Sequence, residues 1–193
     1  MKFFGTVLFL SIVLMSFRVE VVNAFVKLVI FGTKVELKNN YKTFNVSYNF
    51  NNPKSLTNQS LDFEIFVKRD LNDLKLMISY HVIALNNTMQ NALLKRSIDI
   101  CFFLRNPRSD RMIKSIFDYI KERSHLPSRC PIPVGSYYMH NLKLADMPLP
   151  GLLPEAEFMV DFGYYSGIKQ EITISFRLYG KLVRIIENIL PSI

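Results

Sequence analysis

The side chains that most often perform chemistry in proteins are few and widely separated in this sequence. The three histidines, His81, His125 and His140, have no cysteine, aspartate or second histidine at the spacing that metal ligands require. The string Gly163–Gly167 comes nearest to the nucleophile motif of hydrolases, but its serine stands one place late, in an expected turn. The seven glycines are scattered, so no phosphate-binding loop is formed. These residues predict neither a metal site nor a catalytic nucleophile.

Paired carboxylates, the other common means of acid–base catalysis, are also sparse. Asp70 and Asp73 lie in one polar stretch, and Glu155 and Glu157 lie in another, where carboxylates are normally solvated. We therefore expect a protein that is not an enzyme and that uses no cofactor and no metal. A catalytic set assembled from distant residues is the alternative, because sequence spacing does not address it.

The charge balance is basic, with 24 Lys and Arg against 16 Asp and Glu and a net charge of +8. Its visible clusters are Lys95, Arg96, Arg105, Arg108, Arg111, Arg123 and Arg129. Aromatic residues do not interleave with these bases, so nucleic acid is not an expected partner. A solvated basic face is the simplest interpretation, and an anionic lipid headgroup or membrane surface is the next.

The first 24 residues have the layout of a secretory signal peptide. A basic start, Met1–Lys2, precedes a nearly unbroken apolar run over residues 3–17, and Val22 and Ala24 stand where a signal peptidase reads small or branched residues. The apolar run is shorter than the ~20 residues needed to span a bilayer, which disfavours the alternative of an uncleaved anchor. We expect a secreted, extracellular protein with one domain over residues 25–193.

Secretion gives meaning to the two cysteines and to three sequons. In an oxidising compartment we expect Cys101 and Cys130 to pair, with two free thiols or an intermolecular bridge as the alternatives. Asn45, Asn58 and Asn86 each fit the acceptor pattern for N-glycosylation and lie in polar stretches.

Apolar residues recur mostly at period two, which indicates strands. The pattern predicts strands over residues 25–37, 44–50, 61–68, 74–85, 98–104, 157–165 and 172–178. A two-residue hairpin turn at Ser166–Gly167 is expected between the last two. This succession of strands and turns is typical of an antiparallel sandwich or barrel.

One segment, over about residues 110–124, follows helical spacing instead. Its apolar positions are Met112, Ile113, Ile116, Phe117 and Ile120. Ser109 or Asp110 can cap its start, and Pro127 is expected to end it.

The aromatic content is unusual, with 16 Phe, 9 Tyr and no Trp. Most of these residues stand at positions that alternate inward. A close-packed core is one interpretation. The other is that the two sheets do not close fully and leave an apolar cavity for a lipid-like ligand.

The stretch Ser97–Pro107, with its order Cys-x-x-x-Arg-Asn-Pro, resembles a hallmark of a large insect family of secreted proteins, mostly of unknown function. The resemblance continues through the amphipathic helix, the Cys130–Pro131 pair, the Leu149–Gly151 loop and the strand after Pro154. It covers about the last 110 residues well and the earlier strands by layout only. The family is similar to the lipid-recognition (ML) superfamily, whose relatives include the ganglioside activator protein and insect chemosensory proteins.

The resemblance implies an immunoglobulin-like antiparallel β-sandwich with a hydrophobic cavity between its sheets. It also implies a disulfide between Cys101 and Cys130, and ligand binding or presentation, as in pheromone detection or taste, without catalysis. Many members have a second cysteine pair in the first two strands. Here Val35 and the stretch Asn45–Phe50 stand in its place, so we expect a less constrained N-terminal edge.

These observations predict a secreted, glycosylated β-sandwich that binds a small hydrophobic or lipid-like ligand and that meets a membrane receptor or membrane surface. The candidates for the cavity lining or core are Phe63, Ile65, Leu76, Ile78, Phe102, Phe158, Val160, Phe162, Ile174 and Phe176. Met112, Ile116 and Phe117 are candidates for a lid. The alternative function is a fully packed sandwich that binds another protein through its surface.

Overall fold

The computed structural model describes residues 24–84, 88–166 and 171–188. The chain divides into a main unit, residues 28–185, and a smaller unit made of residues 1–27 and 186–193. The described part of the smaller unit consists of the first residues of the strand β1 and the last residues of the strand β9.

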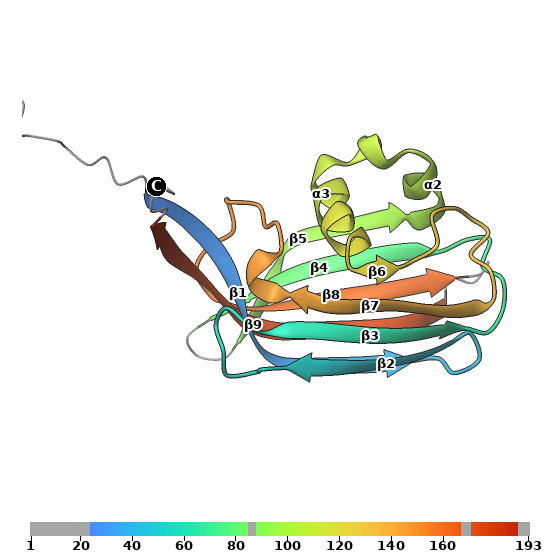
Figure 1. Cartoon of the computed structure of the whole chain (residues 1–193), viewed down its shortest axis with the longest axis horizontal. Helices are drawn as coiled ribbons and strands as arrows, with labels where there is room; N and C mark the ends of the chain where they lie inside the picture. Colours follow the sequence, from blue (N-terminus) through green and yellow to red (C-terminus); the bar gives the residue numbers. More distant parts are fainter. Residues whose placement is uncertain (1–23, 85–87, 167–170, 189–193) are drawn as a thin grey trace, which may run out of the picture. The chain divides into compact units, whose positions relative to one another are not determined.

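Two antiparallel sheets form the main unit (Figure 1). The five-stranded sheet has the order β1 (Ala24–Asn39), β9 (Glu171–Asn188), β8 (Glu157–Ser166), β4 (Lys75–Ile83) and β5 (Met89–Asp99). The four-stranded sheet has the order β2 (Phe44–Asn51), β3 (Ser60–Val67), β7 (Gly135–Lys143) and β6 (Ser124–His125). The prediction of an antiparallel β-sandwich is confirmed.

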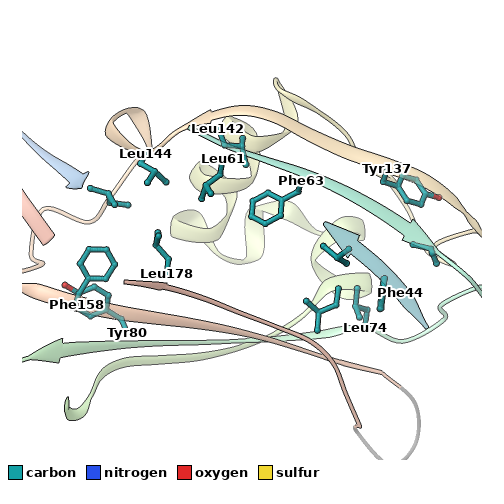
Figure 2. Close-up of a cluster of buried hydrophobic side chains, with 14 of the residues drawn as sticks. Phe44, Leu61, Phe63, Leu74, Tyr80, Tyr137, Leu142, Leu144, Phe158 and Leu178 are labelled. Carbon is teal, nitrogen blue, oxygen red and sulfur yellow. The ribbon is translucent and has the colours of Figure 1, made fainter. Parts of the chain in front are cut away.

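Alternation along the strands sends one set of side chains into the space between the sheets. In β3, for example, Leu61, Phe63 and Val67 are buried while Glu64 and Phe66 are exposed. Figure 2 shows buried side chains of the two sheets facing one another. The largest hydrophobic cluster includes Phe44, Leu61, Phe63, Leu74, Tyr80, Tyr137, Leu142, Leu144, Phe158 and Leu178.

The predicted strand over residues 98–104 is wrong beyond Asp99. β5 ends there, and Ile100–Arg105 forms the helix α2. The Asp99 carboxylate accepts a hydrogen bond from the Phe102 backbone N–H at 2.8 Å, which satisfies a free donor of the first helical turn. A short apolar run does not by itself distinguish a strand from a buried helix, and here the capping aspartate favours the helix.

The predicted helix over residues 110–124 is observed as α3, Arg111–Lys121. Asp110 is its N-cap and accepts hydrogen bonds from the backbone N–H groups of Met112 and Ile113, both at 3.1 Å. The helix ends before the predicted boundary, because Ser124–His125 pairs with β7 as the strand β6. Pro127 therefore lies beyond the strand and does not end the helix.

Two short 3₁₀ helices complete the described secondary structure, η1 (Pro107–Ser109) and η2 (Leu144–Asp146). At the end of β8, Ser166 pairs with Glu171 of β9, so Ser166 belongs to a strand and not to a two-residue turn. The turn itself, with Gly167, lies outside the described residues, as does the sequon asparagine Asn86. None of the helices within the described residues has the length and apolar content to span a bilayer.

Candidate ligand site between the sheets

The inner face of the five-stranded sheet carries one row of side chains that keeps accessible surface. Ile78 of β4 pairs with Phe162 of β8, which pairs with Phe176 of β9. All three side chains are partly exposed, although they point into the sandwich. The rows on either side hold the buried side chains of Leu76, Ile174, Tyr80 and Leu178. The same two rows also hold Tyr164 and Val160, which are partly exposed. We refer to Ile78, Phe162 and Phe176 as the open row, because it is the row in which every side chain keeps accessible surface.

The four-stranded sheet faces this row with apolar side chains. The ring of Phe63 meets the ring of Phe176 edge to face, with centroids 5.1 Å apart, and so joins the two sheets. Ile65 of β3 and Met139 of β7 also point inward and are partly exposed. Apolar side chains of both sheets therefore face one another here while keeping part of their surface accessible.

The helices α2 and α3 lie beside β5 and β6, the outermost strands of the two sheets on that side (Figure 1). A second buried cluster, of Leu76, Ile98, Phe103 and Ile113, joins them to the five-stranded sheet. Met112 and Phe117 of α3 pack against this cluster, as do Ile78 and Phe162 of the open row. The disulfide between Cys101 and Cys130 ties α2 to the segment that follows β6, as the sequence predicted.

The structure brings most of the predicted lining residues together. Phe63, Leu76, Phe158 and Ile174 are buried. Ile65, Ile78, Val160, Phe162 and Phe176 are partly exposed on the inner faces. Among the helix residues, Met112 and Phe117 adjoin the site, whereas Ile116 is partly exposed and packs against neither buried cluster.

The prediction that Phe102 lines the cavity or core is wrong, because its side chain is 49% exposed. The sequence predicts Phe102 as a lining or core residue because residues 98–104 are nearly all apolar, as in a strand that is covered on both faces. In the helix α2 the buried positions are instead Cys101 and Phe103. The Phe103 ring stacks edge to face on the ring of Phe117, with centroids 5.4 Å apart, and takes the place that the prediction gave to Phe102.

Two tyrosines of the inner face were not among the predicted site residues. Burial raises the pKa of Tyr80 to about 12, and it also raises the pKa of Tyr164. The Tyr164 side chain nevertheless keeps part of its surface exposed. Tyr80 stands two residues after Ile78, and Tyr164 stands two residues after Phe162, so both point to the same face of the sheet as those residues. This spacing could have identified them from the sequence.

The outer face of the four-stranded sheet carries a different feature, an open, polar depression of about 410 Å³. Its lining residues are Ser47, Tyr48, Asn49, Asp62, Glu64, His140 and Asn141. Glu64 Oε1 lies 2.6 Å from His140 Nε2, and Asp62 accepts a hydrogen bond from the Asn141 backbone N–H at 2.7 Å. The His140 ring stacks on Tyr138 with centroids 4.5 Å apart. The sequence did not predict this cluster, because its residues lie on different strands that are distant from one another in the sequence.

The structure also bears on metal binding and on the predicted glycosylation sites. Within the part of the chain that the structure describes, no group of three or more His, Cys, Asp or Glu side chains could hold a metal ion. The sequon residues Asn45 and Asn58 are both exposed, so each could carry a glycan without displacing the core.

Comparison with known proteins supplies a family match and two distant structural likenesses. Residues 73–160, from the start of β4 into β8, match a family described as a protein of unknown function (DUF1091). The matched segment holds α2, α3 and both cysteines. No curated protein matches the sequence.

Among solved structures, chicken MD-1 in complex with lipid IVa is similar over 87% of this chain and 100% of that chain, with 10% identity and a TM-score of 0.37. The C-terminal domain of Wzt is similar over 89% of this chain and 87% of that chain, with 15% identity and a TM-score of 0.28.

Proposed function

We propose that this protein binds a small hydrophobic or lipid-like ligand between its two sheets. The observation that carries the proposal is the row of Ile78, Phe162 and Phe176, apolar side chains that point between the sheets and yet stay partly exposed. An acyl chain that displaces water from such a surface buries its methylenes, and each buried methylene makes the binding free energy more favourable by ~0.8 kcal/mol. The cost of ordering the ligand offsets part of this gain.

The helix side of the sandwich supplies the route by which a ligand enters. Met112 and Phe117 of α3 pack against the same buried cluster as Ile78 and Phe162, so we expect a small displacement of α3 to open a path toward these two residues. Such a lid needs no change in the pairing of either sheet. The disulfide between Cys101 and Cys130 limits the displacement at one end.

An extracellular setting and a chemosensory role belong to the same proposal. The disulfide supports a compartment that is oxidising. The apolar, aromatic site contains no paired acid and base, which supports binding without catalysis. An expression profile confined to chemosensory tissue supports the chemosensory role, and uniform expression across tissues contradicts it.

Native mass spectrometry tests the binding proposal on the disulfide-bonded protein secreted from a eukaryotic host. We expect a co-purified lipid, or saturable binding of at least one member of a panel of fatty acids and long-chain hydrocarbons. A protein that carries no lipid and binds no member of the panel contradicts the proposal.

A second candidate function is a protein-binding surface on the outer face of the four-stranded sheet. Phe66 is 43% exposed there and Tyr138 is 41% exposed, next to the polar depression. A photo-cross-linking residue at Phe66 should then capture a specific secreted protein or receptor. The same residue at Leu152, which is 82% exposed in a loop, is the matched control. Equal capture at both positions contradicts this candidate.

A further inference from the structure

The sequon asparagine Asn45 stands opposite an exposed phenylalanine. Asn45 of β2 and Phe66 of β3 are direct partners in the antiparallel pair, and both side chains point away from the interior of the sandwich. Directly opposed side chains on one face of such a pair have Cβ atoms roughly 4.5–5.5 Å apart. Asn45 is exposed, and Phe66 is 43% exposed. A group attached to the Asn45 amide therefore starts beside the Phe66 ring.

The neighbours of Phe66 in the sheet leave its ring uncovered. On the side away from β2, Phe66 pairs with Ser136 of β7, so the residues that face it on both sides are short and polar. The preceding outward residue of β3 is Glu64, which pairs with Ser47 and Tyr138. Tyr138 is thus diagonal to Phe66 on the same face, and it is 41% exposed. Two accessible aromatic rings lie beside the sequon.

We infer that Asn45 carries an N-linked glycan whose first sugar packs against the Phe66 ring. N-acetylglucosamine has an apolar face of C–H groups and a rim of polar groups. Its apolar face can cover the aromatic ring while its hydroxyls stay in water, and the removal of apolar surface from water stabilises the contact.

This inference rests on the extracellular setting proposed above, because N-linked sugars are added along the secretory route. It does not depend on a ligand between the sheets. The glycan would occupy the surface that the second candidate function gives to another protein. The sugar contact and that candidate are therefore competing explanations of the exposed Phe66 ring.

The sequon residue Asn58 provides a contrast within the same chain. It is exposed in the turn between β2 and β3, outside the residues that pair in these two strands. Its backbone is held within the turn, where its N–H donates to Ser55 Oγ at 3.1 Å and its carbonyl accepts from Asn52 Nδ2 at 3.2 Å. A glycan at Asn58 therefore starts above a turn and not beside an aromatic ring of a paired strand.

Thermal unfolding of the protein secreted from a eukaryotic host tests the inference, after glycopeptide mass spectrometry has measured the occupancy of Asn45. We expect Asn45→Gln to lower Tm by about 2–4 °C, the shift expected for a contact about as strong as an aromatic pair. Asn58→Gln is the matched control and should leave Tm unchanged. In a Phe66→Leu background, Asn45→Gln should have a smaller effect, because the ring that the sugar covers is already absent.

Nuclear magnetic resonance of the glycan gives an independent readout of the contact. Protons of the first sugar at Asn45 should be shifted upfield by the Phe66 ring in the wild type and not in Phe66→Leu. Trimming with an endoglycosidase that leaves only the first N-acetylglucosamine should keep both this shift and Tm.

Two results overturn the inference and leave the proposal of ligand binding intact. One is a secreted protein in which Asn45 is unmodified. The other is a modified Asn45 whose sugar protons show no upfield shift and whose substitution leaves Tm unchanged. A protein that does not enter the secretory route contradicts the extracellular setting itself, and the inference falls with it.

Discussion

Gln59, immediately before β3, is hydrogen-bonded to both backbone groups of Gly32 in β1. The Gly32 N–H donates to Gln59 Oε1, and Gln59 Nε2 donates to the Gly32 carbonyl, each at 2.8 Å. Nε2 also donates to the Pro53 carbonyl at 2.7 Å, and the Gln59 side chain has no exposed surface. One side chain thus links the four-stranded sheet to the five-stranded sheet and fixes their separation at this end of the sandwich.

Gln59→Ala should lower the free energy of unfolding by about 2–4 kcal/mol, because it leaves the two Gly32 groups buried without partners. Urea unfolding monitored by circular dichroism measures the change. Gln90→Ala, at an exposed position of β5, is the matched control and should stay within about 0.5 kcal/mol of the wild type. Equal effects of the two substitutions would show that the Gln59 link contributes nothing to stability.

Gly180 of β9 should not tolerate a side chain. A Cβ atom there would lie 2.5 Å from the Phe31 carbonyl oxygen and 3.2 Å from the Phe158 ring. We expect Gly180→Ala to destabilise the protein by about 1–3 kcal/mol through overpacking. Gly151→Ala is the control, because a Cβ at Gly151 has no neighbour within 4 Å. Thermal unfolding of the two variants side by side decides the question, and indistinguishable melting temperatures would contradict it.

The disulfide should stabilise both the fold and the helix side of the site. Cys101 and Cys130 are 29 residues apart, and loop-closure entropy predicts a contribution of about 3–4 kcal/mol. The double variant Cys101→Ala, Cys130→Ala should lose this amount in urea unfolding. It should also exchange the amide hydrogens of α2 faster than the wild type. If exchange in α2 is unchanged, the disulfide does not restrain this helix.

Stability should fall in alkaline solution because of the buried tyrosines. Burial raises the pKa of Tyr80 to about 12, and it also raises the pKa of Tyr137 and Tyr164. A tyrosine in the unfolded chain ionises near pH ~10, so above that pH the unfolded state releases protons that the folded state retains. The contribution is therefore fully present below about pH 10 and is lost as the pH rises toward about 12.

Unfolding free energies measured between about pH 9 and pH 12 test this dependence. The decline should be shallower in Tyr80→Phe than in the wild type, because that variant has lost one late-titrating group. Identical slopes would show that Tyr80 ionises alike in the folded and unfolded states.

Much of the sandwich could be predicted from local pattern, because period-two alternation depends only on which face of a strand is buried. β3 and β8 are examples, since their inward residues Phe63, Phe158 and Phe162 stood at alternate positions. β7 was missed because the aromatic residue Tyr138 stands at one of its exposed positions and obscures the alternation of apolar and polar residues. The strand with which it pairs, β3, is also distant in the sequence. The helix α2 was missed because the capping hydrogen bond of Asp99 competes with an apolar run that suits a strand equally well.

The site itself could be predicted only in part. Alternation identified Ile78, Phe162 and Phe176 as inward, but it could not show that they form one row, because the row depends on the register of three strands. The partial exposure of these side chains depends on the separation of the sheets, which distant contacts such as Gln59 to Gly32 help to determine. The Tyr80 hydroxyl is buried without a hydrogen-bond partner, and this too is a property of packing that has no signature in the sequence.

The central claim is that a hydrophobic ligand lies between the sheets, and contact quenching of a single tryptophan tests it most directly. The natural sequence has no tryptophan, so Phe162→Trp places one reporter in the open row and Phe66→Trp places one on the outer face. A fatty acid brominated in mid-chain quenches tryptophan only on contact and serves as the probe for both variants. The account predicts saturable quenching of Phe162→Trp and none of Phe66→Trp. Quenching confined to Phe66→Trp, or absent from both variants while each remains folded, would contradict it.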